Sequence, residues 1–138
     1  MPFNLFAIVK DHAGEIDNAS LMRDLRKDAR FQQFRLFTED LHLPKTTIVV
    51  MEQDGWRVRF FIRPGEDMTL DLPALKKEMG KNAVKLPADF LDYRTEIAFG
   101  FADDPDQLFT DDVIEVGEFV RANYPGVVIY DQYNKDLW

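Results

Sequence analysis

The dipeptide Asp54-Gly55 constrains the fold of this chain more than any other local feature. Two runs rich in β-branched and aromatic residues flank it, over residues 46–63, and this pattern predicts a β-hairpin with a two-residue type I′ turn. The turn fixes the register, which pairs Gln53 with Trp56, Met51 with Val58, Val49 with Phe60, Glu52 with Arg57 and Val50 with Arg59. The first three pairs share a mostly apolar face, so we expect one face of the hairpin to be buried and the other to be mostly solvated.

Further apolar runs and amphipathic segments follow one another along the chain without a linker or a repeat. We expect strands over residues 3–9, 93–101 and 127–130, and helices over residues 19–30, 70–79 and 111–122. The predicted order is β-α-β-β-α-β-α-β. This order indicates a single α+β domain over residues 1–138, with a mixed or antiparallel sheet, a central hairpin and helices packed on it.

The predicted helix ends carry recognisable capping residues. Asp17, Asn18 and Ser20 are candidate N-caps of the first helix, Asp71 of the second and Thr110 of the third. Phe31, Phe34 and Phe37 recur at a spacing of three, so we expect the first helix to run on or restart through them, with His42 at a helix end. Its basic side chains, Arg23, Arg26, Lys27 and Arg30, are expected to be solvated.

The negative charge of the chain is concentrated in its C-terminal half. Residues 1–65 hold 10 basic and 9 acidic side chains, and residues 66–138 hold 7 basic and 16 acidic ones, so the second half accounts for the whole net charge of −8. Such a field repels nucleic acid and anionic membranes and attracts basic partners. A plainer interpretation, in which the charge only keeps the protein soluble, stays open.

Seven carboxylates and no Lys or Arg lie between Phe101 and Phe119. On a helical wheel, Asp111, Glu115 and Glu118 form one stripe with Asp112 beside it, opposite an apolar stripe of valines. We therefore predict an exposed patch that engages a basic protein partner. Its carboxylates are Asp103, Asp104, Asp106, Asp111, Asp112, Glu115 and Glu118.

Phe119 lies inside the acidic arc of this wheel. One interpretation is that another element of the fold covers it. The other is that it is an exposed apolar anchor ringed by carboxylates, as in a binding hot spot, and on that ground it is included among the partner-binding residues.

The sequence carries no catalytic signature. It has no Cys, no Walker loop, no glycine-rich dinucleotide loop, no nucleophile elbow and no zinc-protease motif, and its two His, His12 and His42, have no second ligand at metal spacing. Asp103, Asp104 and Asp106 follow a strand end, but a solvated acidic loop is a better interpretation of them than a metal site. We expect no catalytic residue, no metal and no cofactor.

The apolar run of residues 5–9 is too short for a signal peptide or a membrane span. We therefore expect a cytoplasmic protein with no membrane partner.

The C-terminal segment consists of an acidic helix followed by PGVVIYDQYNKDLW. From Asp111 onward it resembles the endings of some bacterial polymorphic-toxin immunity proteins, in which a last strand leads through a Tyr-Asp or Phe-Asp step to a terminal Trp. Tyr130, Asp131 and Trp138 fill those places here. The resemblance implies a small α+β protein that binds and inhibits a cognate toxin in the producing cell. The resemblance assigns no binding residue to this chain.

Two other classes of function remain open. A small-ligand-binding or regulatory module is expected to show a concave pocket lined by aromatic side chains. A carboxylate-dependent enzyme is expected to show two carboxylates converging in a cleft with raised pKa values. A mimic of nucleic acid is a further, less favoured alternative. An inhibitor is instead expected to expose the acidic stripe.

Overall fold

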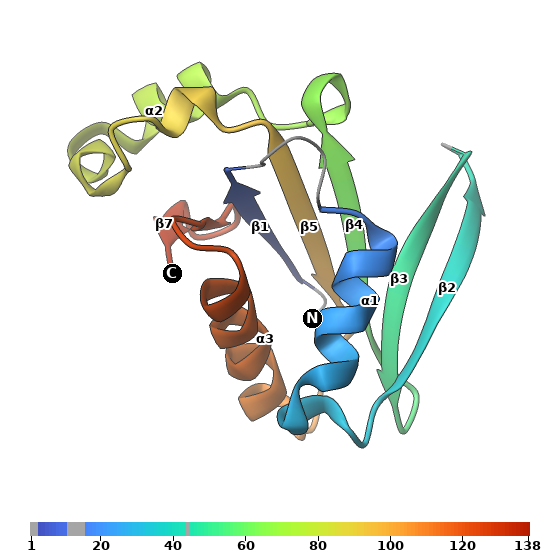
Figure 1. The fold of residues 1–138 in the computed structure, drawn as a ribbon. Helices are drawn as coiled ribbons and strands as arrows, with labels where there is room; N and C mark the ends of the chain where they lie inside the picture. The colour runs from blue at the N-terminus through green and yellow to red at the C-terminus, as the bar shows by residue number, and fades with distance from the viewer. Residues whose placement is uncertain (1–2, 11–15, 44) are drawn as a thin grey trace.

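A seven-stranded sheet, antiparallel throughout, forms the centre of the molecule (Figure 1). The computed structural model describes residues 3–10, 16–43 and 45–138. The strand order is β2-β3-β4-β5-β1-β6-β7. The strands are β1 (Phe3–Val9), β2 (Arg35–His42), β3 (Lys45–Gln53), β4 (Trp56–Pro64), β5 (Thr95–Phe101), β6 (Val128–Asp131) and β7 (Asp136–Leu137).

Helices cover both faces of this sheet. They are α1 (Asn18–Lys27), α2 (Leu72–Met79) and α3 (Thr110–Asn123), and short 3-10 turns occur at Ala29–Phe31, Gly65–Asp67, Gly80–Lys85 and Phe90–Asp92. Helices α1 and α3 pack over the larger core on one face, and α2 with the turns after it closes a smaller core on the other (Figure 1). The predicted single α+β domain is thereby confirmed.

The hairpin of β3 and β4 has the predicted register, from Gln53 opposite Trp56 to Val49 opposite Phe60. Asp54 and Gly55 have φ of 51° and 83°, the positive values that a type I′ turn requires at both central positions. The apolar face is buried as expected. On the other face, Val50 is also fully buried, because β2 pairs alongside β3 and supplies neighbours that the hairpin alone lacks.

The prediction of a helix through Phe31, Phe34 and Phe37 is wrong. Helix α1 ends at Lys27, a short 3-10 turn carries Phe31 into the core, and the chain then extends into β2 from Arg35. Phe31 and Phe34 are buried beside this turn. Phe37 is half-buried and lies opposite Val50 in the sheet. His42 therefore ends a strand rather than a helix, and His12 lies outside the described residues.

The caps of the first two helices agree with the sequence. Asp17 caps α1 in a reciprocal capping box with Ser20. Asp71 caps α2 by accepting a hydrogen bond from the N–H of Ala74 at 3.1 Å, and Gly80 ends it with φ of 56°. These ends fix where α2 begins and stops on the sheet.

A buried carboxylate joins the α2 layer to the sheet. Glu96 in β5 is fully buried and accepts hydrogen bonds from Arg63 Nη1 at 3.0 Å, from the backbone N–H of Thr69 at 3.0 Å and that of Leu70 at 2.9 Å, and from Thr69 Oγ1 at 2.8 Å. A buried charge is tolerated when it is paired and hydrogen-bonded in this way. Glu96 therefore fixes the segment that leads into α2.

The helices of the described part of the chain are all too short or too polar to cross a membrane.

Candidate functional site

The loop between β5 and α3 is ordered by one of the predicted carboxylates. Asp104 accepts hydrogen bonds from the backbone N–H groups of Leu108 at 2.9 Å and Phe109 at 2.8 Å. These N–H groups belong to the two residues that precede α3, so Asp104 fixes the backbone that leads into the helix. The expected cap Thr110 is instead the first residue of the helix, and its hydroxyl donates to the carbonyl of Gln107.

The same loop is held against the hairpin by Trp56. Its indole stacks on Phe109 with ring centroids 4.5 Å apart and an interplanar angle of 3°. Its Nε1–H donates to the carbonyl of Ala102 at 3.1 Å. Because one side chain satisfies both a packing and a hydrogen-bonding requirement, the acidic loop has a defined position relative to the sheet.

The end of the chain lies over α3. The backbone N–H of Trp138 donates to the carbonyl of Ile129 at 2.9 Å, and its indole lies against Gly117. A Cβ at position 117 would lie 3.3 Å from the indole, tighter than an ordinary contact, so the glycine lets Trp138 approach closely. Trp138 as a whole residue is 40% exposed.

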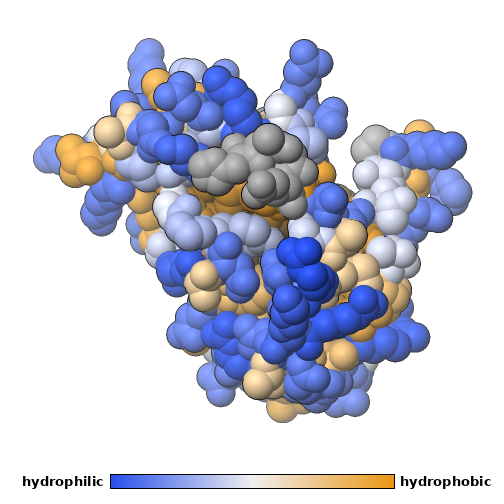
Figure 2. Space-filling model, in the orientation of Figure 1, coloured by the Kyte–Doolittle hydropathy of each residue, from blue (hydrophilic) through white to orange (hydrophobic). Residues whose placement is uncertain are grey.

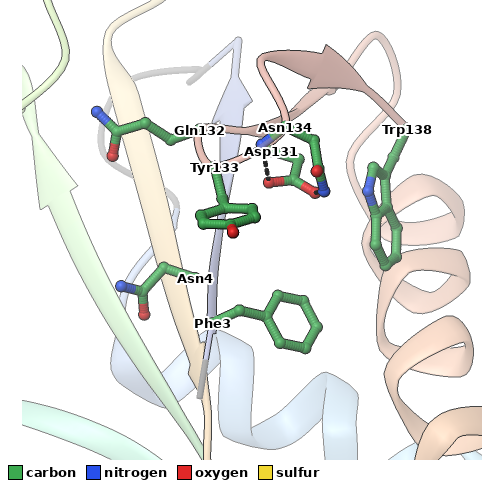
Figure 3. Close-up of a pocket in the computed structure, with 7 residues that line it drawn as sticks. All are labelled: Phe3, Asn4, Asp131, Gln132, Tyr133, Asn134 and Trp138. Carbon is green, nitrogen blue, oxygen red and sulfur yellow. Dashed lines mark hydrogen bonds between the residues drawn. The ribbon is translucent and has the colours of Figure 1, made fainter. Parts of the chain in front are cut away.

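A groove of about 410 Å³ lies between the start of α3, the loop before it and Trp138. Its lining is mainly apolar, and the residues are Phe3, Trp56, Phe101, Ala102, Asp104, Gln107, Thr110, Val113, Ile114 and Trp138. A second hollow, of about 620 Å³, shares Phe3 and Trp138 with it and continues to the turn between β6 and β7. Figure 3 shows this hollow, with Tyr133 above Phe3 and Trp138 on the α3 side.

Large apolar side chains are exposed around the groove. Ile114 is 49% exposed, Leu108 is 73% exposed, and Tyr133 is exposed at the far end of the second hollow. Clustered exposed apolar surface with a polar rim is typical of a protein interaction site. These residues are not among those predicted from the sequence. The sequence signal for Ile114 is its position on the helical wheel, where it lies outside the valine stripe and next to the acidic stripe.

The seven predicted carboxylates lie along one stretch of surface, but with different environments. Asp103, Asp106, Asp111 and Glu118 are exposed, and Asp104, Asp112 and Glu115 are half-buried. The valine stripe faces the core as expected, since Val116 and Val120 are buried and Val113 packs against them. Asp104 is the only one of the seven that lines the groove, and Asp111 and Glu118 are the helical neighbours of Ile114 at its edge.

The carboxylates interact with one another. The pKa of Asp112 is raised, first by burial and then by the charges of Glu115, Asp111 and Asp104. The four groups are thus close enough to repel one another. A cation placed among them would relieve this repulsion.

Glu118 has a partner within the chain. Arg30 Nη1 lies 3.3 Å from Glu118 Oε2, and the same guanidinium forms a two-pronged pair with Asp28 at 2.9 and 2.7 Å. The prediction that Arg30 is simply solvated is wrong, because it bridges the turn after α1 to α3. This pairing holds the pKa of the Asp28 carboxyl below its usual range.

Phe119 is not an exposed anchor. Its side chain is 0% exposed and makes an edge-on contact with Phe31, with ring centroids 5.8 Å apart. The alternative interpretation, in which another element covers it, is correct, and the covering element is the 3-10 turn after α1. An exposed apolar side chain next to carboxylates on α3 is found instead at Ile114.

Within the described residues, no three His, Asp or Glu side chains are grouped as a metal site would require. Asp131 lines the second hollow and is hydrogen-bonded to Asn134. The Nδ2 of Asn134 donates to the Oδ2 of Asp131 at 2.7 Å (Figure 3).

Comparisons with protein-family models, with curated proteins and with solved structures give no match for this chain.

Proposed function

We propose that this protein is an acidic binding protein that holds and inhibits a basic protein partner. The observation that carries the proposal is the apolar groove at Ile114 and Trp138, which has Asp104 in its lining and exposed Asp111 and Glu118 next to Ile114 on α3. Buried apolar contacts supply most of the affinity at such sites, whereas surrounding charges select the partner and speed its approach.

The partner that fits this surface presents an apolar side chain flanked by Lys or Arg. The apolar group would enter the groove against Ile114 and Trp138, and the basic groups would face Asp106 and Asp111. Both of these carboxylates are exposed, and neither has an ion-pair partner among the residues described. Binding would therefore break no existing ion pair at these two positions.

The resemblance of the C-terminal segment to bacterial immunity proteins suggests which class of protein the partner belongs to. In this proposal the partner is a toxin domain, and the protein neutralises it in the cytoplasm of the producing cell. The negative charge of the C-terminal half disfavours nucleic acid and anionic membranes as partners. The function is binding and not catalysis.

The direct test uses the reading frame next to the gene for this protein. Its product is expressed in a host cell alone and together with this protein. We expect the neighbouring product to stop growth alone and this protein to restore growth. Ile114→Lys, which places a charge at the groove, should abolish protection.

Val84→Lys is the matched control, because Val84 is also an exposed apolar residue but belongs to the layer after α2. It should protect as well as the unmodified protein. A harmless neighbouring product, or equal protection by both variants, would contradict the proposal.

A further inference from the structure

Strands β3 and β4 are paired over only part of their length. Their register begins at the turn and stops at Val49 opposite Phe60. Beyond this point β3 stays with β2 as far as Lys45, and β4 stays with β5 as far as Pro64. The two strands therefore separate, and the β2–β3 hairpin leans away from the rest of the sheet (Figure 1).

The separation leaves backbone groups without a strand partner. In an antiparallel strand, alternate residues direct both backbone groups to the same neighbour. Counting from the bonded pair Gln53 and Trp56 beside the turn, Thr47 and Ile62 direct theirs into the gap. The side chain of Asn18 takes the place of a strand at one of them, since its Nδ2 donates to the carbonyl of Thr47 at 2.9 Å.

A cavity of about 440 Å³ occupies the gap. It is lined by Leu41, Lys45, Thr46, Ile48, Phe61, Ile62, Arg63, Asp67 and Thr69. Figure 2 shows the molecule notched on this side, between the tip of the β2–β3 hairpin at the upper right and the remainder. The volume lies in the range of small-molecule sites.

The floor of the cavity is apolar, and the charged side chains in its lining are Lys45, Arg63 and Asp67. Leu41 and Phe61 supply the accessible apolar surface, since Ile48 is only 1% exposed, and the Arg63 guanidinium lies over the Phe61 ring at 5.1 Å. Arg63 is held rigidly by the buried Glu96, which also neutralises its charge. Lys45 is different, because no ion-pair partner for it exists among the residues that the structure describes.

We propose that this cavity binds a small organic acid with an apolar body. The body lies on Phe61 and Leu41, away from Asp67, and the carboxylate accepts hydrogen bonds from Lys45 and from the open N–H groups of the gap. Lys45 and the backbone of Ile62 are donors facing this space, and an acid supplies the acceptors that they lack.

The shape of the gap favours a compact ligand over an inserted peptide strand. A strand needs a neighbour about 4.8 Å away on each side along its length. The gap is a wedge that closes at Val49 and Phe60. Its width changes along the strands, so it offers that spacing at only one distance from the closed end.

The test is a titration of the ¹⁵N-labelled protein, followed by amide NMR, with 3-phenylpropionate and with the uncharged 3-phenylpropanol as the matched probe. We expect saturable shifts confined to residues 45–48, 61–63 and 69 with the acid, and weaker binding of the alcohol. Lys45→Gln should lower the affinity for the acid by roughly two- to fivefold, the range for one exposed ion pair. The affinity for the alcohol should not change.

Lys76→Gln is the control, since Lys76 is an exposed lysine on α2 that does not line the cavity. It should bind the acid as the unmodified protein does. The proposal is overturned if acid and alcohol bind equally, if neither gives saturable shifts, or if the shifts lie elsewhere. It is also overturned if extended peptides bind in the gap and the acid does not.

Discussion

The indole of Trp138 lies against Gly117, and a Cβ at that glycine would come within 3.3 Å of the indole Cε3 atom. This contact joins the end of the chain to the middle of α3. It positions Trp138 as a wall shared by both hollows of the candidate site. The site therefore depends on a helix residue with no side chain.

Gly117→Val should displace Trp138. The added methyl groups occupy the space of the indole, whereas Gly117→Ala, the control, needs a shift of only a few tenths of an ångström. Trp56 is almost fully buried, so acrylamide quenching of Trp fluorescence reports mainly on Trp138. We expect stronger quenching for the valine variant than for the alanine variant. Equal quenching in all three proteins would contradict the contact.

Phe119→Ala and Ile114→Ala should separate stability from binding. Phe119 is a core residue, so its truncation should lower the free energy of unfolding by roughly 3–5 kcal/mol. Ile114 is half exposed, so the same truncation there should change stability little and weaken partner binding. Chemical denaturation measures the first effect. A large loss of stability at Ile114 would show that it belongs to the core.

Tyr124→Phe should stabilise the protein, because the Tyr124 hydroxyl is buried and has no hydrogen-bond partner within the described residues. Removing an unsatisfied buried group recovers a penalty of about 1–3 kcal/mol. Burial also raises the pKa of Tyr124 to about 12, from a usual value of 10.0.

The sign of the pH effect follows from this shift. Between pH 10 and about 12 the folded protein retains a proton that the unfolded chain loses, so stability falls as pH rises through this window. Urea unfolding at pH 8 and pH 11 should show a smaller alkaline loss for the Phe variant. An equal loss in both proteins would contradict this assignment.

Gly55→Ala should destabilise the hairpin by roughly 1 kcal/mol or more. The space around Gly55 is open, so the cost comes from its φ of 83° and not from a collision. Asp54→Asn is the control, because Asn tolerates positive φ. Thermal unfolding should separate the two. A melting temperature unchanged by Gly55→Ala would mean that the turn is of another type.

The hairpin was predictable from the sequence because its turn chemistry is local. Asp54 and Gly55 determine the turn, and the turn determines the register of ten residues. The caps of α1 and α2 were predictable for the same reason. Strand β2 was not, since Phe31, Phe34 and Phe37 carry a helical spacing and only pairing with β3 makes the segment extended.

The candidate site could be predicted only in part. The acidic residues are close together in the sequence, and their stripe on α3 follows from helical geometry. The groove is made by Phe3, Trp56, Ile114 and Trp138, which only the tertiary fold brings together. Glu96 was missed for a similar reason, because its partners lie 26–33 positions away.

The most direct test of the binding proposal is the association rate of the partner as a function of salt. A photoreactive amino acid at position 114 identifies the partner by crosslinking, with position 84 as the control. Association is then measured for the unmodified protein and for the double variant Asp106→Lys/Asp111→Lys. Asp106 and Asp111 are preferred to Glu115 and Glu118, because Glu118 already pairs with Arg30. We predict slower association for the double variant at low salt, and a difference that shrinks as salt rises, since charges are screened over about 8 Å at physiological ionic strength. An unchanged association rate with the same salt dependence would contradict the proposal.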